Sequence, residues 1–145
     1  MKKFAIYFTL FILCFSCKND DDTSNGCVSK LLPDYPFDTG STINLNLPQY
    51  SGLQFAGNTL FLSSYGVKGV YLYNTGSSIV AFEASDPAHA PNSCSLMSLN
   101  GIELVCSCEN YKYQLLTGQQ VVGGTGNCLR AYRVDRNTNI VRVYN

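Results

Sequence analysis

The side chains best suited to chemistry are gathered in the stretch Asp86–Gly118, which holds the chain's single histidine and three of its seven cysteines. Thiolate, imidazole and carboxylate are groups that bind zinc in proteins. Asp86, His89, Cys106 and Glu109 could therefore hold one metal ion such as zinc. Their spacing is not specific, because they come from separate loops. We expect instead a surface loop with a solvated histidine and capping carboxylates, in which Asp86 before a proline forms a turn. We predict no metal site, with His89 and Cys106 as the alternative ligands.

Short strands must position these loops. Asn100-Gly101 favours a tight turn, so Leu96–Leu99 and Ile102–Val105 are predicted to form a hairpin between the two cysteine-bearing loops. A further strand is expected at Tyr111–Leu116, and the turn Thr117-Gly118 follows it. The hairpin would bring both loops to the same end of a small sheet.

The rest of the chain is also expected to be β-structure. Strict alternation in Thr42–Leu47 is typical of a strand with one buried face. Further strands are predicted at Leu53–Phe55, Thr59–Leu62, Val67–Tyr73, Ser78–Glu83, Leu129–Val134 and Ile140–Tyr144. We expect an all-β domain of about nine or ten short strands, arranged as an antiparallel sandwich or small barrel.

Composition limits the classes of function. The chain has 145 residues, which is the length of one domain. Ten basic and ten acidic side chains balance, so no basic face for nucleic acid is implied. Seven cysteines are many for this length and indicate an oxidising compartment.

The N-terminus has the pattern of a lipoprotein signal. After Met1-Lys2-Lys3, the 12 residues Phe4–Phe15 are apolar apart from one threonine, which is too short a run to span a bilayer and suits a secretion signal. The run ends in Phe15-Ser16-Cys17, which resembles the lipobox of bacterial lipoproteins. We predict a signal peptide over residues 1–16 and lipidation of Cys17 on its thiol and amine. An ordinary signal peptide with an incidental cysteine is the alternative.

Residues 17–27 are predicted to be the lipidated cysteine and an acidic tether, because Lys18 to Gly26 carry no apolar side chain. A lysine followed closely by acids resembles the surface-export signal of lipoproteins in one Gram-negative lineage. We therefore expect residues 28–145 to form the folded domain. It would be anchored by lipid to the outer membrane of a Gram-negative bacterium and displayed at the cell surface, unless the tether is a plain solvated linker.

The region from Gly66 to Asn145 resembles the Rieske ferredoxin-like domain. Gly69–Tyr73 followed by Ile79–Glu83 looks like the hairpin before that family's first cluster loop, and Thr117-Gly118 matches its Thr-Gly turn. The family's second loop begins Cys-Pro-Cys-His, where this chain has Cys-Ser-Cys-Glu at 106–109. The chain also looks like small lipoproteins with Rieske-like folds and degenerate cluster loops. These resemblances imply a Rieske-like fold and an anchor.

A Rieske cluster needs two thiolates on one iron and two imidazoles on the other. The resemblance places the first ligand pair at Asp86 and Ala88 and the second at Cys106 and Glu109, so only Cys106 keeps its chemistry. Because the chain has one histidine, the two-imidazole iron cannot be built. We predict no cofactor, with a [2Fe-2S] cluster held by atypical ligands as the alternative.

The resemblance also implies a disulfide between the two loops. Rieske proteins of the respiratory type join their cluster loops in this way, and Cys94 and Cys108 lie in the corresponding loops. Cys106–Cys128 and Cys27–Cys128 are competing pairings for the remaining cysteines. A redox-active pair of Cys106 and Cys108 is not favoured, because cysteines so close in sequence are strained as a pair and no helix N-terminus lowers their pKa.

No catalytic constellation is found, so we do not expect an enzyme. No strand–turn–helix elbow frames a serine, and Gly123–Gly126 lacks the following helix that would bind phosphate. Sequence spacing does not give the separations among the carboxylates Glu83, Asp86, Glu103 and Glu109. The predicted function is a membrane-anchored binding or structural module with a protein or glycan partner. The alternative is a Rieske-type electron carrier with unusual cluster ligation.

Overall fold

The structure is a computed structural model that describes residues 29, 31–124 and 126–145. The predicted signal peptide (1–16) and the predicted tether (17–27), with Cys17 and Cys27, lie outside the described residues. Among the residues that are described, no helix has the length and apolar character needed to cross a membrane.

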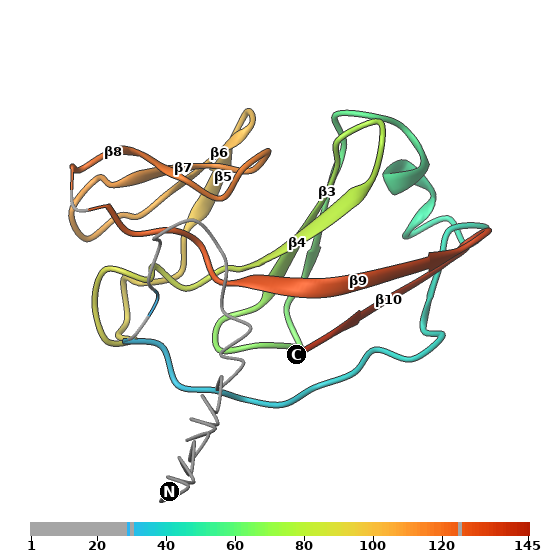
Figure 1. The fold of residues 1–145 in the computed structure, drawn as a ribbon, viewed down its shortest axis with the longest axis horizontal. Helices are drawn as coiled ribbons and strands as arrows, with labels where there is room; N and C mark the ends of the chain where they lie inside the picture. The colour runs from blue at the N-terminus through green and yellow to red at the C-terminus, as the bar shows by residue number, and fades with distance from the viewer. Residues whose placement is uncertain (1–28, 30, 125) are drawn as a thin grey trace, which may run out of the picture.

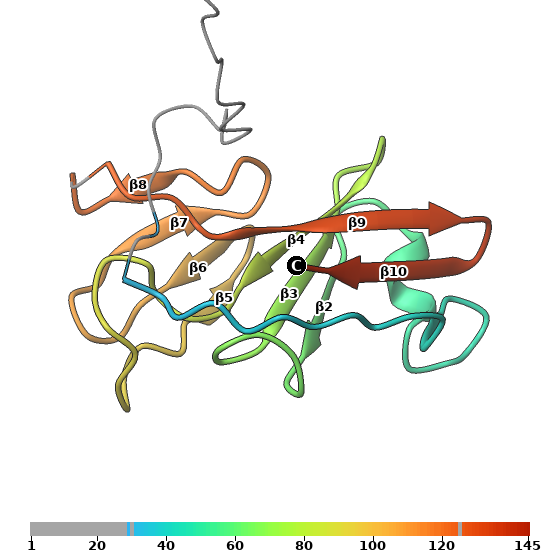
Figure 2. The same cartoon turned by 60° about the horizontal axis from the view of Figure 1, so that its bottom comes forward.

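Two antiparallel sheets form the domain (Figure 1, Figure 2). The larger has six strands in the order β1-β10-β9-β4-β3-β2. These are β1 (Ile43–Asn44), β2 (Thr59–Leu62), β3 (Val70–Asn74), β4 (Ile79–Glu83), β9 (Ala131–Asn137) and β10 (Ile140–Tyr144). The smaller sheet has four strands in the order β5-β6-β7-β8, namely β5 (Ser98–Asn100), β6 (Glu103–Val105), β7 (Lys112–Gln114) and β8 (Gln120–Val122). The predicted all-β class with about ten short strands is confirmed.

The hairpin of β3 and β4 leads the chain into the first cysteine-bearing loop. Its register runs from Asn74 opposite Ile79 to Val70 opposite Glu83. At the turn, the Thr75 N–H donates to the Ser78 carbonyl at 2.8 Å. Glu83 is therefore the last strand residue before the loop, and it is fully buried.

Two of the predicted strands are wrong in detail. Most of Leu53–Phe55 lies in a 3-10 helix, η1 (Ser51–Gln54), because the Leu53 N–H donates to the Tyr50 carbonyl instead of to a neighbouring strand. Of the predicted strand Thr42–Leu47, only β1 (Ile43–Asn44) is a strand. The chain turns after it, because the Leu47 N–H donates to the Asn44 carbonyl and the Leu47 carbonyl accepts the N–H groups of Tyr50 and Ser51.

The hairpin predicted between the two loops is present, in a different register. Asn100 pairs with Glu103, so the turn residues are Gly101 and Ile102 instead of Asn100 and Gly101. Gly101 has a positive φ of 63°, a conformation that glycine adopts without a steric penalty. This register places Leu104 opposite Leu99, and the Leu104 side chain is fully buried.

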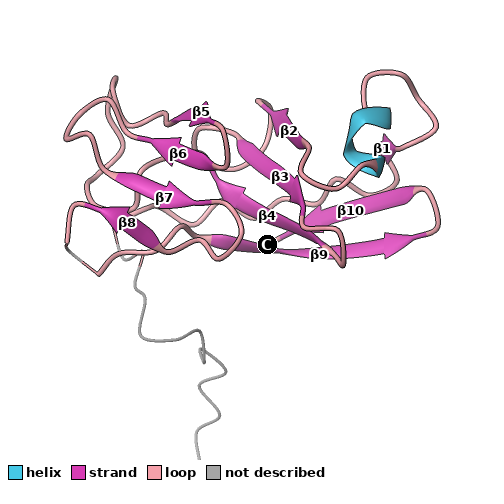
Figure 3. Ribbon diagram, turned by 90° about the horizontal axis from the view of Figure 1, so that it is seen from above, coloured by secondary structure: helices cyan, strands magenta, loops and turns pink. Residues whose placement is uncertain are grey.

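The core has two parts, and the second one supports the loops. The first covers the larger sheet and includes Ile43, Leu72, Val141 and Val143. The second packs Tyr71 and Phe82 of the larger sheet against residues of the smaller sheet and of the segments that flank its strands, including Met97, Leu104, Cys106, Tyr113, Leu115 and Leu129. Figure 3 shows the smaller sheet beside one end of the larger. The first cysteine-bearing loop connects the two sheets, and the second connects two strands of the smaller sheet.

Candidate functional site

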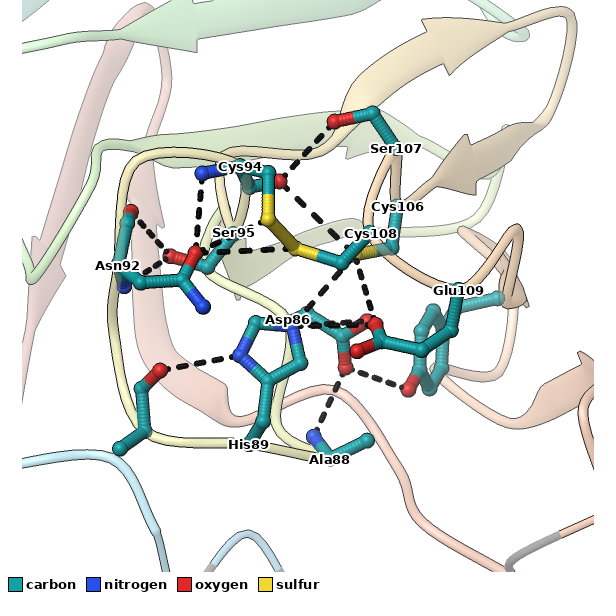
Figure 4. A network of polar contacts seen from close by, with 12 residues as sticks. Asp86, Ala88, His89, Asn92, Cys94, Ser95, Cys106, Ser107, Cys108 and Glu109 are labelled. Carbon is teal, nitrogen blue, oxygen red and sulfur yellow. Dashed lines mark hydrogen bonds and ion pairs between the residues drawn. A yellow bond between two sulfur atoms is a disulfide. The ribbon is translucent and has the colours of Figure 1, made fainter.

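Two loops lie together at one end of the smaller sheet and carry the candidate site (Figure 4). The first (residues 84–97) joins β4 to β5, and the second (residues 106–111) joins β6 to β7. Cys94 and Cys108 connect them in a disulfide with Cα atoms 5.4 Å apart. The Ser107 hydroxyl also donates to the Cys94 carbonyl at 3.1 Å. The disulfide implied by the resemblance is thus present.

Polar side chains of the first loop fold it onto itself. Asp86 Oδ1 accepts the Ala88 N–H at 2.8 Å, and Asn92 Oδ1 accepts the Cys94 N–H at 2.9 Å. Both are Asx turns, in which the side chain replaces a backbone acceptor. The Asp86 N–H donates to the Ser95 carbonyl at 2.9 Å and closes the loop. The turn predicted at Asp86 is therefore confirmed.

Asp86 is not the exposed capping carboxylate that we expected. Its side chain is fully buried, because the turn directs it toward Tyr113 on β7. The Tyr113 hydroxyl donates to Asp86 Oδ1 at 2.7 Å. Burial, followed by this hydrogen bond, raises the pKa of Tyr113, so its hydroxyl stays a donor at neutral pH. Asp86 Oδ2 is buried and has no hydrogen-bond partner.

Cys106 is a buried free thiol, the one free cysteine among the residues that the structure describes. Burial, and secondly its interaction with the Asp86 carboxylate, raises the pKa of the Cys106 thiol to about 12. The thiol is therefore protonated at neutral pH when no cation is close. Its Sγ lies 3.7 Å from His89 Nε2 and 3.7 Å from Glu109 Oε2.

His89 points into the site instead of into solvent. Its side chain is 19% exposed, and Nε2 lies 3.3 Å from Glu109 Oε2 and 3.9 Å from Asp86 Oδ2. Nδ1 lies 3.0 Å from the Ala90 carbonyl. Because a carbonyl only accepts, Nδ1 donates the proton of this bond, and Nε2 faces the site.

Three of the four residues predicted as alternative metal ligands, His89, Cys106 and Glu109, are thus brought together from two loops, with their donor atoms within 4.8 Å of one another (Figure 4). The fourth, Asp86, lies beside His89. Two other carboxylates that the sequence placed nearby are used elsewhere. Glu103 on β6 forms an ion pair with Lys112 on β7 at 3.8 Å, and the Glu83 carboxylate accepts hydrogen bonds from backbone N–H groups. The sequence thus named the right residues for a cluster of donors and misjudged the exposure of Asp86 and His89.

Glu83 anchors the backbone on the approach to the site. Its Oε1 accepts the N–H groups of Lys68 and Ser85, each at 2.9 Å. Its Oε2 accepts the Val67 N–H at 2.7 Å and the Tyr132 hydroxyl at 2.6 Å. This buried carboxylate therefore joins three separate segments and fixes the residue that precedes Asp86.

One of the two competing pairings of the remaining cysteines is excluded. Cys106 is a free thiol, whereas Cys128 is disulfide-bonded. The proposed Cys106–Cys128 pairing is therefore wrong, because the Cys106 thiol faces the second loop and His89 instead. The competing partner of Cys128, Cys27, lies outside the described residues.

The donor set does not fit a [2Fe-2S] cluster. Ala88 offers no ligand atom, the chain has one histidine, and Cys108 is in a disulfide. A cluster also keeps the ligands of its two irons well apart, because two bridging sulfides lie between the irons. Here the thiol of Cys106 and the imidazole of His89, which would bind different irons, are only 3.7 Å apart.

Tyr113 is the residue of the site that sequence reasoning missed. It lies in the predicted strand Tyr111–Leu116, where the alternation of residue types predicts a buried side chain at this position. Nothing in the sequence shows that its hydroxyl meets a carboxylate 27 residues earlier in the chain. That contact depends on how the first loop folds over β7.

No protein-family model and no curated protein matches this sequence. Among solved structures, the chain is similar to the ferredoxin of carbazole 1,9a-dioxygenase from Nocardioides aromaticivorans IC177, with 17% identity over 76% of this chain and 97% of that one and a TM-score of 0.46. It is also similar to a Sphingomonas yanoikuyae B1 ferredoxin, with 12% identity, coverage of 63% and 88%, and a TM-score of 0.44. At such identities and TM-scores, these likenesses carry no argument about function.

Proposed function

We propose that this chain is a lipid-anchored protein of the bacterial outer membrane whose Rieske-like domain works without a [2Fe-2S] cluster, as a binding or structural module. The observation that carries the proposal is the set of side chains at the cluster position. Ala88 stands where a ligand is needed, and His89 faces Cys106 and Glu109 instead of a second imidazole.

The loop pair is held in place by the protein itself. The Cys94–Cys108 disulfide and the hydrogen bond from Ser107 to Cys94 connect the two loops, and the bond from Tyr113 to Asp86 holds the first loop on β7. Loops ordered before binding lose less conformational freedom when a partner binds. A rigid pair of loops at the end of the domain suits recognition of a protein or a glycan at the cell surface.

The absence of a cluster is tested on the mature protein isolated from its host under anaerobic conditions. We expect a colourless protein without stoichiometric iron or acid-labile sulfide. A brown sample with about two irons and two sulfides per chain would overturn the proposal in favour of a Rieske-type electron carrier.

The anchor is tested by mass spectrometry of the N-terminal peptide and by fractionation of cells. We expect acyl chains on Cys17, and we expect Cys17→Ala to move the protein out of the membrane fraction. A mature chain that begins at another residue would refute the anchor. Protease digestion of intact cells tests surface display.

The partner is sought by cross-linking on intact cells, followed by enrichment of the tagged protein. The proposal predicts one protein or glycan that is captured by the wild-type chain. Its capture should fall when both Cys94 and Cys108 are replaced by serine, because the loops are then no longer joined.

A further inference from the structure

We propose that the loop pair binds a single divalent ion of the zinc class through His89 Nε2, Cys106 Sγ and Glu109 Oε2. Asp86 Oδ2 completes the set as the fourth donor. The inference goes beyond the module proposed above, because it assigns the site a mononuclear ion that replaces the cluster chemistry.

The separations among the donors match those of ligands around one small ion. Zinc lies roughly 2.0–2.3 Å from nitrogen, oxygen and sulfur ligands in a tetrahedron, which puts the ligand atoms roughly 3.3–3.6 Å from one another. His89 Nε2 is 3.3 Å from Glu109 Oε2, and Cys106 Sγ is 3.7 Å from both. These three atoms therefore form one face of a tetrahedron of the right size.

Asp86 supplies an independent indication of a missing partner. Its carboxylate is fully buried, and Oδ1 is satisfied by Tyr113 and Ala88 while Oδ2 has no hydrogen-bond partner. A buried polar atom without a partner is unfavourable by about 1–3 kcal/mol. Oδ2 faces the cluster, 3.9 Å from His89 Nε2. A cation bound beside His89 Nε2 would give this oxygen a partner.

Groups that would not bind the ion themselves hold the donor side chains in position, as they do in known metal sites. Histidine ligands usually donate their second ring N–H to a carbonyl or carboxylate, which fixes the ring and its tautomer. His89 Nδ1 makes this contact with the Ala90 carbonyl at 3.0 Å. The Tyr113 hydroxyl holds the other oxygen of Asp86 at 2.7 Å. Both ligands are thus preset without a change in the loops.

The nature of the donors selects the ion. One thiolate, one imidazole and carboxylate oxygens suit zinc and its substitute cobalt, whereas calcium and magnesium prefer oxygen alone. On binding, the Cys106 thiol gives its proton to solvent and a metal–sulfur bond forms. Four protein ligands would fill the tetrahedron, which is typical of a structural site.

The test is a titration with Co²⁺ of the mature chain, stripped with a chelator and kept under non-reducing conditions so that Cys94 and Cys108 stay paired. We expect one equivalent to bind with a thiolate-to-cobalt absorption band in the near ultraviolet and intense visible bands of tetrahedral cobalt. Zn²⁺ should displace it, and metal analysis should give one zinc per chain.

Matched variants assign the ligands. Cys106→Ser should abolish the thiolate band, and Glu109→Gln should weaken Co²⁺ binding roughly tenfold or more. Glu103→Gln removes a carboxylate of similar exposure from the neighbouring strand pair and should leave binding unchanged. Circular dichroism checks that each variant is folded.

Three outcomes would overturn the inference: no band with wild-type protein at millimolar Co²⁺, a band that survives Cys106→Ser, or equal weakening by Glu109→Gln and Glu103→Gln. The wild-type titration is decisive even if a variant fails to fold. If the protein does not bind Co²⁺, the proposal of a module without a cluster is unaffected. Iron and sulfide in the protein isolated from its host would overturn that other proposal.

Discussion

The Tyr113 hydroxyl donates a 2.7 Å hydrogen bond to Asp86 Oδ1, and so joins β7 to the start of the first loop. Both side chains are completely buried. The bond uses one oxygen of Asp86 and leaves the other directed toward His89. Tyr113 is therefore a positioning residue, because it acts on the cluster of donors through Asp86.

Replacing Tyr113 by phenylalanine should lower the free energy of unfolding by about 1–3 kcal/mol, because a hydrogen bond to a buried carboxylate is lost. Urea denaturation of the metal-free protein measures this change. Tyr144→Phe is the control, since the Tyr144 hydroxyl makes no hydrogen bond to any described residue while its ring packs against Arg142. Equal effects of the two substitutions would show that the Asp86 contact contributes nothing.

Asp86→Asn should separate stability from metal binding. Asparagine keeps the acceptor for Tyr113 and replaces the unpartnered Oδ2 by an N–H donor near Cys106 and His89. We expect the metal-free variant to unfold at the same urea concentration as wild type or higher, with a gain of up to about 1 kcal/mol. The stabilisation that Zn²⁺ gives to wild type should be lost. If the metal-free variant is less stable than the metal-free wild type, Asp86 serves the stability of the fold and not metal binding.

The disulfide should stabilise the domain by restricting its unfolded chain. Cys94 and Cys108 are 14 residues apart, and closing a loop of about 15 residues contributes about 3 kcal/mol in the chain-entropy model. The double variant Cys94→Ser/Cys108→Ser should lose about this much in urea denaturation. Ser107→Ala removes only the hydrogen bond to the Cys94 carbonyl and should cost no more than about 1 kcal/mol.

An ion pair far from the site gives a test of pH dependence. Arg142 Nε lies 2.9 Å from Asp38 Oδ1, and the side-chain hydrogen bond lowers the pKa of Asp38 from 3.8 to about 2. Because the folded-state pKa is below the unfolded value, the pair stabilises the fold above pH 3.8 and this contribution is lost as the pH falls through about 2.

Carboxyl NMR shifts across that range measure the pKa directly. In Arg142→Gln we expect the pKa of Asp38 to return toward 3.8. The difference in stability between wild type and variant should be constant above pH 5 and vanish toward pH 1. High salt should weaken the effect, because both side chains are exposed to solvent. An unchanged pKa in the variant would refute the pairing in solution.

Local patterns predicted most of the fold. Short segments between turn residues located β3, β4, β9 and β10, and the Asn-Gly pair located the β5–β6 hairpin. The register of that hairpin was wrong by one turn position, because the left-handed conformation of Gly101 and burial of Leu104 decide it. The segment Leu53–Phe55 was predicted as a strand, since an apolar residue such as Leu53 fits either a strand or a 3-10 turn.

The candidate site was harder to predict, because its geometry depends on contacts between distant residues. His89 and Cys106 are separated by 17 positions, and their approach requires the disulfide and the turn at Asp86 together. The count of one histidine excluded the conventional cluster without any structure. Whether the candidate donors converge could be read only from the folded loops.

Glu83 has a consequence for protein engineering. It holds the N–H groups of Lys68 and Ser85 and the Tyr132 hydroxyl, and none of these belongs to the cluster of donors. Glu83 thus fixes the backbone at Ser85, directly before Asp86, and this contact does not depend on what the donors bind. A new side chain at position 88 can therefore be introduced on this frame to redesign the ligand chemistry without rebuilding the start of the first loop.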